Sequence, residues 1–264
     1  MIQKKEHQAP FSVSYNCGII INISVMLLNE LFIPLPEGIG DPNIFKALFV
    51  LGAPGSGKTT ISRILTGWAG LRNVTPDQFY EMFLKQRGAQ KFTVSPDLDS
   101  DPEWIRSRAL ATTRLEKFLN GRLGLVIDAT GRYAPSIERQ INKLRSLGYD
   151  VAVMYVKTDT ETAVQRQQTR DRQMNPEIVR QYHQDVQNNI SQYADLVGDN
   201  FVVLNNSGDS AAAAINNPQD FESAERRKLT ADQWFRRWLR TPVDNTAARS
   251  WRHSQTSHSL SAAN

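Results

Sequence analysis

The stretch Gly52-Ala53-Pro54-Gly55-Ser56-Gly57-Lys58-Thr59 decides the fold of this chain. It fits the phosphate-binding pattern of Gly, four residues, and then Gly-Lys-Ser/Thr. An apolar run at 47–51 precedes it and a helix-compatible run at 60–68 follows it, which is the strand, loop and helix context that the motif needs. With glycine at about 7% of residues, a chance match is expected in roughly one such chain in a hundred. The stretch therefore predicts a binding site for a nucleoside triphosphate.

The residue types in this loop suit a phosphate chain. Its glycines permit backbone angles that a side chain would forbid, so that N–H groups can curl around a phosphate at a helix N-terminus. We expect Lys58 to reach the β- and γ-phosphates and the Thr59 hydroxyl to bind Mg²⁺. The predicted nucleotide-contacting residues are Gly52, Ala53, Pro54, Gly55, Ser56, Gly57, Lys58, Thr59 and Thr60.

The composition allows one α/β domain with appendages. The chain has 264 residues, 40% of them hydrophobic, which is enough for a sizeable core. A net charge of +4 permits an anionic partner without requiring one. Cys17 is the only cysteine, so no intramolecular disulfide can form and a reducing cytoplasm is expected. The four histidines lack zinc-ligand spacing, which argues against a structural metal.

The one strongly apolar stretch, residues 17–28, is too short to span a bilayer and lacks a clear signal-peptide cleavage site. We therefore expect a packing segment and no membrane partner. Met26 is a plausible alternative start, so residues 1–25 are predicted to form an extension outside the fold. The main domain is predicted to cover residues 26–207.

Strand-like and helix-like segments alternate after the phosphate loop. Runs compatible with β-strands lie at 71–75, 123–127, 151–156 and 201–204, and helical patterns separate them. Their apolar continuity is typical of strands that are covered on both faces. The alternation predicts a parallel, doubly wound sheet.

The character of the chain changes after residue 207. Small and polar residues predict a linker, followed by a basic amphipathic helix at 225–240 that carries Trp234, Phe235 and Trp238. Two interpretations stay open for this helix: docking on the domain, or nucleic-acid contact through its arginines and tryptophans. Residues 241–264 are predicted to lack ordered structure.

Three classes of phosphate-loop protein compete. A GTPase would use Asp128-x-x-Gly131, whose spacing matches, but it also needs Asn-Lys-x-Asp near 205–209, where the lysine is missing. A motor-type ATPase usually sets a glutamate beside the corresponding aspartate to activate water, and Ala129 stands there. The remaining class transfers phosphate to a bound acceptor, as a small kinase does.

The kinase interpretation gives roles to other residues. Asp77 lies at a helix start, where a carboxylate could face an acceptor hydroxyl; the alternative is a plain helix cap after Pro76. A cluster of arginines, Arg166, Arg170 and Arg172, could close over the phosphates and neutralise charge; the alternative is a solvated helix face.

Taken together, the phosphate loop, the segments 74–79 and 126–131 and the arginine run 166–172 resemble the zeta-toxin and polynucleotide-kinase branch of P-loop kinases. The stretch 120–206 is especially similar to small zeta-toxin-like kinases encoded by tailed bacteriophages. This resemblance implies a three-layer αβα fold with a five-stranded parallel sheet of order 2-3-1-4-5 and a helical lid. It also implies the use of ATP and Mg²⁺.

The predicted site follows from these two lines of inference. The catalytic candidates are Lys58, Asp77, Arg170 and Arg172, and Thr59 with Asp128 would hold Mg²⁺. The resemblance places Asp77 at the position of the acceptor-activating aspartate.

The acceptor is left open by the sequence. Polynucleotide kinases carry a basic residue three positions after the aspartate, and Tyr80 stands there. The predicted function is ATP-dependent transfer of phosphate to a hydroxyl of a small molecule, a nucleotide sugar or a nucleic acid. The alternative is a non-catalytic nucleotide-binding module that acts in regulation or assembly. The expected location is the cytoplasm, which is that of the host if the chain is phage-encoded.

Overall fold

The computed structural model describes residues 40–88, 92–93, 100–170, 172–207 and 231–261. The predicted extension at 1–25, which includes Cys17, and the predicted linker after residue 207 lie outside these ranges. Among the helices of the described residues, none is both long and apolar enough to cross a membrane.

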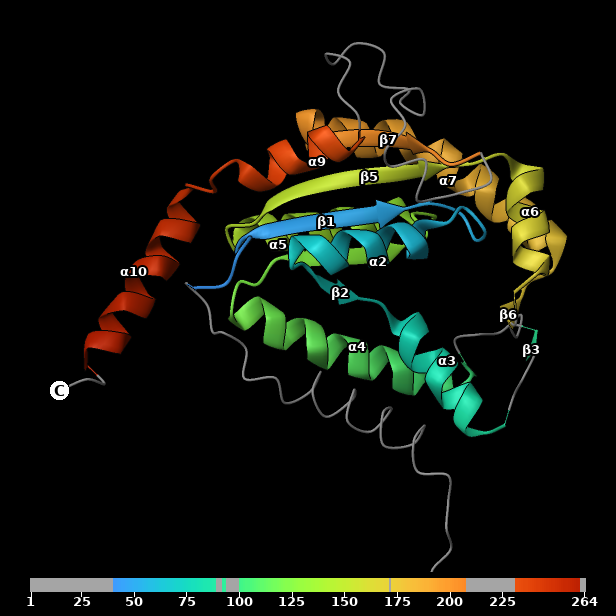
Figure 1. Ribbon diagram of the computed structural model, residues 1–264, viewed down its shortest axis with the longest axis horizontal. Helices are drawn as coiled ribbons and strands as arrows, with labels where there is room; N and C mark the ends of the chain where they lie inside the picture. Colours follow the sequence, from blue (N-terminus) through green and yellow to red (C-terminus); the bar gives the residue numbers. More distant parts are fainter. Residues whose placement is uncertain (1–39, 89–91, 94–99, 171, 208–230, 262–264) are drawn as a thin grey trace, which may run out of the picture. The chain divides into compact units, whose positions relative to one another are not determined.

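The central sheet has five parallel strands in the order β2-β4-β1-β5-β7 (Figure 1). When these five strands alone are numbered along the chain, the order is 2-3-1-4-5, which confirms the prediction. The central strand β1 is buried along its whole length, which agrees with the apolar run at 47–51. The strands are β1 (Lys46–Leu51), β2 (Arg72–Val74), β4 (Leu125–Ala129), β5 (Asp150–Lys157) and β7 (Phe201–Asn205).

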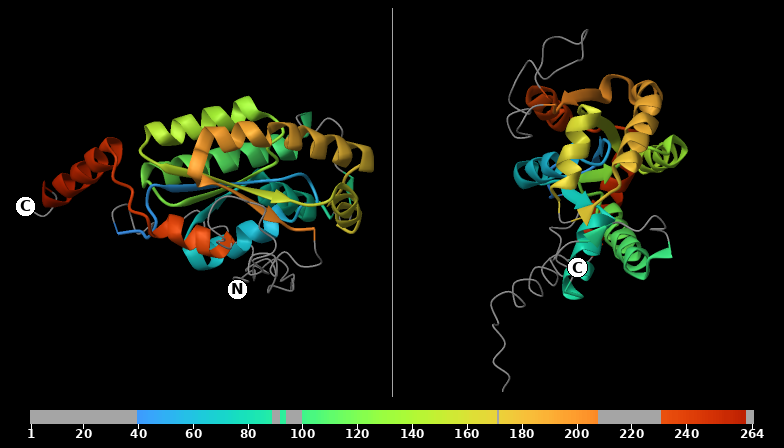
Figure 2. Two further views of the ribbon diagram at one scale, coloured as in Figure 1. Left: turned by 90° about the horizontal axis from the view of Figure 1, so that it is seen from above. Right: turned by 90° about the vertical axis from the view of Figure 1, so that its right-hand side faces the viewer.

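Helices cover both faces of this sheet. Side chains of α2 and α9 share one hydrophobic cluster with the strands, while α5 and α7 pack on the other face (Figure 2). The helices are α2 (Lys58–Ala69), α3 (Pro76–Gln86), α4 (Pro102–Asn120), α5 (Ala134–Ser146), α6 (Thr160–Gln168), α7 (Pro176–Val197), α9 (Ala231–Arg240) and α10 (Thr246–Ser261), with a 3₁₀ turn η2 (Gly198–Asn200).

Three helices begin with the same local device. Thr75, Asp101 and Asn175 each accept a backbone hydrogen bond at a helix N-terminus, and a proline follows each of them. A proline suits the first helical position because its missing N–H would have no partner there. These caps fix where α3, α4 and α7 start at the carboxyl end of the sheet.

A second, two-stranded parallel sheet was not predicted. It pairs β3 (Phe92–Thr93) with β6 (Arg172–Gln173). The arginine run 166–172 was expected in a helical lid, but α6 ends at Gln168 and Arg172 lies in a strand. Two-residue strands have no periodicity that a sequence pattern could reveal.

The C-terminal helices pack on the domain. Trp234, Phe235 and Trp238 of α9 are buried in the same cluster as β7, which supports the docking interpretation. The prediction of no ordered structure at 241–264 is wrong for α10, because Ala248 is fully buried and the rings of Trp251 and Phe45 pack edge-to-face with their centroids 5.4 Å apart.

A buried lysine joins α9 to the start of the central strand. Lys46 Nζ donates hydrogen bonds to Asp150 Oδ2 and to the Trp238 carbonyl oxygen, both at 2.7 Å, and its side chain is 2% exposed. The ammonium also lies 4.9 Å from the centre of the Trp238 ring. Burial lowers the pKa of Lys46, although its bond to Asp150 opposes this shift.

Candidate phosphate-loop site

The phosphate loop connects β1 to α2 and has the backbone geometry that its glycines allow. Gly55 and Gly57 have φ angles of 84° and 91°, in the left-handed region that favours glycine. A Cβ on Gly55 would lie only 2.1 Å from the carbonyl oxygen of Ala163 in α6. Glycine at position 55 therefore lets the loop lie directly against α6.

The start of α2 is open to an anion. Gly57 is its N-cap, no side chain caps the helix, and no acidic residue lies in its first turn. The N–H groups of Lys58 and Thr59 precede the hydrogen-bonded turns of α2, whose first bonds run from Thr60 and Ile61 N–H to the Gly57 carbonyl oxygen, and the helix dipole favours negative charge there. Lys58 adds a cation at the same place. This arrangement fits a phosphate group.

Asn206, directly after β7, supports the phosphate loop through hydrogen bonds and acts as a brace. Its Nδ2 donates to the Ser56 carbonyl oxygen at 2.7 Å. The backbone carbonyl oxygen of Asn206 accepts from Thr158 Oγ1 and from Arg166 Nη1, each at 2.9 Å. Asn206 is 1% exposed, so these bonds are shielded from water. The sequence had drawn attention to 205–209 only as a failed guanine-reading motif, and it missed this role.

Asp128, at the end of β4, lies under the loop beside Thr59. The Thr59 hydroxyl hydrogen-bonds to its carboxylate, while Asp128 Oδ1 is buried and has no hydrogen-bond partner among the described residues. Burial raises the pKa of Asp128 and the nearby Asp77 carboxylate adds to the shift, while Lys58, Thr59 and Arg170 oppose it. A hydroxyl beside an oxygen with an open coordination position fits the ligands that Mg²⁺ prefers.

Asp77 lies in the first turn of α3 but does not cap it. Thr75 is the N-cap, and its Oγ1 accepts from the Asp77 backbone N–H at 3.3 Å. The alternative in which Asp77 is a plain helix cap is therefore wrong. Val74 pairs with Ile127 on the neighbouring strand, so Asp77 and Asp128 follow adjacent strand ends, and the two carboxylates are close enough to interact.

The three arginines of the predicted lid differ. Arg170 follows α6, and its charge acts on Asp128. Arg166 donates to the Asn206 carbonyl oxygen and is part of the brace under the loop. Arg172 lies in β6, and only its backbone is described. The structure therefore brings Lys58, Thr59 and Arg170 together with the two aspartates.

Tyr80 faces the protein interior. It is 2% exposed, its hydroxyl donates to Asp101 Oδ2 at 2.8 Å, and its ring packs edge-on against Trp104 at 5.4 Å. The position that is basic in polynucleotide kinases therefore holds α3 against α4 in this chain.

The parallel αβα sheet and the phosphate loop at its carboxyl edge define a P-loop nucleotide-binding domain. The model of the AAA_33 family, described as an AAA domain, matches residues 48–192. This is more than half of the chain, which therefore belongs to the AAA_33 family. No curated protein matches it.

Solved structures resemble the chain in fold. The complex AvrRxo1-ORF1:AvrRxo1-ORF2 with sulphate ions gives a TM-score of 0.50 at 17% identity, over 62% of this chain and 55% of that one. The chain thus spans about half the length of that protein. A structure of the PezAT toxin-antitoxin system of Streptococcus pneumoniae gives a TM-score of 0.48 at 14% identity, and the match covers 83% of this chain and 92% of that one. The Pnkp1/Rnl/Hen1 RNA repair complex gives a TM-score of 0.45 at 20% identity, and the match covers 59% of this chain and 48% of that one.

Proposed function

We propose that this chain is an ATP-dependent phosphotransferase that moves the γ-phosphate of ATP to a hydroxyl of an acceptor. The observation that carries the proposal is the position of Asp77. Thr75 takes the capping role, and the Asp77 carboxylate lies near Asp128 at the edge of the sheet where the phosphate loop begins. A passive nucleotide binder would not need a second carboxylate there.

The nucleotide is held by the loop and by the start of α2. Backbone N–H groups and Lys58 bind the phosphates, which the open helix N-terminus supports. Thr59 and Asp128 would hold Mg²⁺, because Asp128 Oδ1 lacks a partner among the described residues. Bound Mg²⁺ would neutralise charge on the β- and γ-phosphates.

The transfer needs one proton acceptor and one mobile cation. Asp77 orients the acceptor hydroxyl and takes its proton while the oxygen forms a bond to the γ-phosphorus. The bond from that phosphorus to the β–γ bridging oxygen breaks, and ADP leaves. Arg170 neutralises charge on the transferring group, with Arg172, two residues further on, as the second candidate. Asp77 then returns its proton to solvent.

The acceptor belongs to one of three classes: a small molecule, a nucleotide sugar or a nucleic acid. Tyr80 is buried against Trp104, so the basic side chain that would favour a polynucleotide at that position has no counterpart there. A nucleic-acid acceptor would need its phosphates to be bound elsewhere on the protein.

A screen with γ-labelled ATP tests the proposal. The protein is incubated with 5′-hydroxyl DNA and RNA, nucleosides and nucleotide sugars, and the label is followed. Label transfer that requires one acceptor class supports the phosphotransferase. Lys58→Ala should abolish transfer and keep the fold, because a surface loop loses one charge and no core contact. Arg139→Gln, an exposed change on α5, is the matched control. Tight ATP binding without transfer to any acceptor would instead favour the regulatory or assembly module.

A further inference from the structure

The turn that follows β4 is fastened to α7 by hydrogen bonds to two backbone carbonyl oxygens. Tyr193 Oη donates to the Gly131 carbonyl oxygen at 2.6 Å. Asn189 Nδ2 donates to the carbonyl oxygens of Gly131 at 3.2 Å and of Arg132 at 2.7 Å. Gly131 comes three residues after Asp128, to which we assign Mg²⁺ binding. The backbone is therefore held from α7 where the chain turns away from the site.

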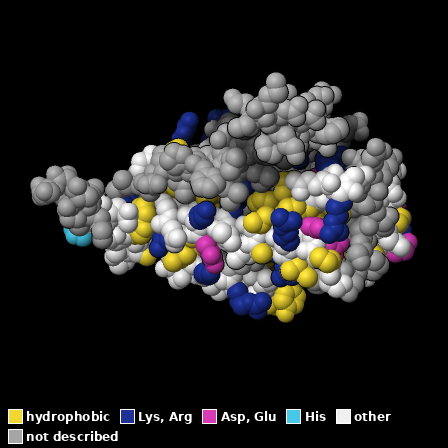
Figure 3. All heavy atoms as spheres, turned by 90° about the horizontal axis from the view of Figure 1, so that it is seen from below, with side chains coloured by type: hydrophobic (Ala, Val, Ile, Leu, Met, Phe, Trp, Pro, Cys, Tyr) yellow, Lys and Arg dark blue, Asp and Glu magenta, His cyan; other side chains and the backbone are white. Residues whose placement is uncertain are grey.

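A side-chain pair strengthens this attachment. Arg132 Nε donates to Asp185 Oδ2 at 3.2 Å, and the guanidinium lies 3.4 Å from the centre of the Tyr182 ring. On the face of the molecule shown in Figure 3, several Lys and Arg side chains lie next to Asp or Glu, and exposed pairs of that kind contribute little to stability. The Arg132 pair differs from them, because stacking on Tyr182 fixes the direction of the guanidinium.

The side chains that hold the turn form one stripe along α7. They are Tyr182, Asp185, Asn189 and Tyr193. Successive members are three or four residues apart, and this spacing places them on the same face of a helix. One face of α7 is thus dedicated to the two residues that follow the end of the β4 turn.

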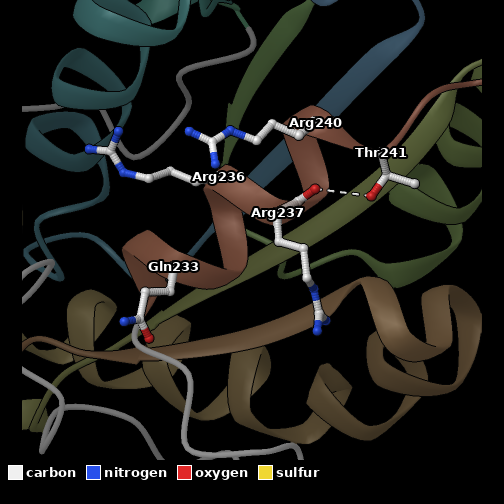
Figure 4. A pocket seen from close by; sticks show the side chains of 5 residues that line it. All are labelled: Gln233, Arg236, Arg237, Arg240 and Thr241. Carbon is white, nitrogen blue, oxygen red and sulfur yellow. Dashed lines mark hydrogen bonds between the residues drawn. The ribbon is translucent and has the colours of Figure 1, made fainter.

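Helix α9, on the other face of the sheet, uses its side chains differently. It buries its tryptophan and phenylalanine rings in the core. Arg236 and Arg240 extend from one side of the helix and Arg237 from the neighbouring side (Figure 4). The exposed side chains around its pocket are Gln233, Arg236, Arg237, Arg240 and, just after the helix, Thr241. Apolar rings are thus enough to pack a helix on this sheet, so the amide and phenol that α7 turns toward the β4 turn need another explanation.

The sheet fixes the backbone around Asp128 on one side only. Asp128 pairs with Val50 of β1, but the pairing of β4 with β2 ends at Ile127, opposite Val74. The direction in which the chain continues after Asp128 therefore depends on the turn. Gly131 has a φ angle of 77° in this turn, which lies in the left-handed region that favours glycine.

The turn is packed between the Tyr193 ring and the end of β1. A Cβ on Gly131 would lie 3.4 Å from Leu51 Cβ and 3.5 Å from a ring carbon of Tyr193. Leu51 is the last residue of β1 and directly precedes the phosphate loop. Burial raises the pKa of Tyr193 to about 12, so its phenol keeps its proton and its role as a donor. Tyr193 thus sets where the turn lies relative to the loop.

We propose that Tyr193 and Asn189 are positioning residues that set the Asp128 carboxylate for Mg²⁺. They act through the backbone of the turn and not through a bond to the metal. Asp128 Oδ1 is buried without a partner among the described residues, while the Thr59 hydroxyl bonds to the same carboxylate. A small rotation of this carboxylate would change the ligands offered to Mg²⁺ more than it would change the fold. The role rests on the Mg²⁺ site of the proposed function, and it needs no acceptor.

A second buried tyrosine provides a matched control. Tyr149 is 2% exposed, as Tyr193 is, and its hydroxyl donates to the Leu123 carbonyl oxygen at 3.0 Å. Leu123 precedes β4, whereas Gly131 follows it. Tyr149→Phe and Tyr193→Phe therefore each remove one buried hydrogen bond next to the same strand, at its opposite ends.

The amide has its own control on the same helix. Asn188 is exposed and accepts from Gln184 Nε2 within α7 at 3.0 Å. Asn188→Ala and Asn189→Ala change neighbouring residues in the same way, and only Asn189 bonds to the β4 turn among the described residues.

The test is calorimetric titration of the full chain with ATP, once in excess Mg²⁺ and once in EDTA. The ratio of the two affinities measures the gain that Mg²⁺ provides. Tyr193→Phe and Asn189→Ala should each reduce this gain by at least about threefold, which is less than the roughly 10–100-fold loss of metal affinity when a direct partner of a metal ligand is removed. ATP affinity in EDTA should stay at the wild-type value, because the phosphate loop is intact. Thermal melts check that the variants fold.

Each outcome decides the proposal. It is supported if the Mg²⁺ gain falls in Tyr193→Phe and Asn189→Ala and stays at the wild-type value in Tyr149→Phe and Asn188→Ala. It is overturned if Tyr149→Phe loses as much of the gain as Tyr193→Phe, since general loosening around β4 would then explain both, or if every variant keeps the wild-type gain. A wild type whose ATP affinity does not respond to Mg²⁺ would overturn the metal site together with this role. Phosphate transfer is not measured, so the phosphotransferase proposal can fail while this role holds.

Discussion

The carboxyl and amino edges of the central sheet, where its parallel strands end and begin, treat buried polar groups differently. At the carboxyl edge, Asp128 keeps a buried oxygen without a partner among the described residues, and the start of α2 keeps open N–H groups. At the amino edge, Lys46 is almost fully enclosed and has both a carboxylate and a carbonyl as acceptors. The first edge retains unsatisfied polar groups that a ligand can complete. The second edge uses the same kind of groups to hold the chain together.

The largest expected effect separates chemistry from stability at the carboxyl edge. Asp77→Asn should reduce transfer by about 10² to 10⁴-fold, the usual contribution of general acid–base catalysis. Folding and ATP affinity should barely change, because Thr75 and not Asp77 caps α3. Single-turnover transfer at saturating ATP and a thermal melt measure the two effects. Wild-type transfer in this variant would remove Asp77 from the mechanism.

The amino edge should respond in the opposite way. Lys46→Met should lower the free energy of unfolding by about 2–3 kcal/mol, because Asp150 and the Trp238 carbonyl lose a charged donor. Asp150 keeps its bond from Asn200 and a quarter of its side chain is exposed, which limits the loss. Denaturant melts measure it, with Lys143→Met on the surface of α5 as the control. A large change in ATP affinity would show that the two edges are coupled.

Asn206 lies at the carboxyl edge yet acts as a brace, so it should affect both properties. Asn206→Ala leaves the buried Ser56 carbonyl oxygen without its donor, which costs about 1–3 kcal/mol. ATP binding should weaken as well, because the loop loses its support. Asn205→Ala is a close control, since its Oδ1 accepts from the N–H and the hydroxyl of Ser207 and not from a group of the phosphate loop among the described residues. If both variants weaken ATP binding equally, Asn206 has no special role.

The smallest expected effect concerns pH. His183 of α7 is buried against the start of α6, where its Nδ1 lies 3.2 Å from Thr160 Oγ1. Burial lowers the pKa of His183, although the Thr158 carbonyl and Asp159 oppose the shift. Below about pH 6.5 the unfolded chain takes up a proton that folded His183 resists, so stability falls with falling pH by at most about 1.4 kcal/mol per pH unit.

Chemical unfolding at pH 7.5 and pH 5.5 measures this loss. His183→Gln, which keeps a donor and an acceptor, should lose less stability than the wild type over this interval. Equal losses in the two proteins would show that other groups cause the pH dependence.

Sequence reasoning was most successful where chemistry is local. The phosphate loop gave Lys58 and Thr59 directly, and the ends of two strands gave Asp77 and Asp128, because a parallel sheet collects such ends at one edge. Arg170 was predicted from the arginine run 166–172, interpreted as a lid over the phosphates. The structure brings these five residues together, and their catalytic roles stay predictions.

The missed features depend on partners far away in the chain. Asn206 braces Ser56 across 150 positions, and Lys46 meets Trp238 across 192 positions. A lysine at the start of a strand looks like a solvated charge until its partners are known. Helix α10 was missed because its residues have a weak apolar periodicity, while its stability comes from contacts such as Trp251 with Phe45.

The bond between Lys46 and Trp238 also constrains how the chain folds during synthesis. The strand that begins at Lys46 is made early, but α9, which covers β7 and completes the cluster, is made only after residue 230. Contacts of such long sequence separation form late and slow folding. Until α9 emerges from the ribosome, the apolar residues Val202 and Leu204 lack their cover. The nascent protein is therefore exposed to aggregation until its synthesis has passed this helix.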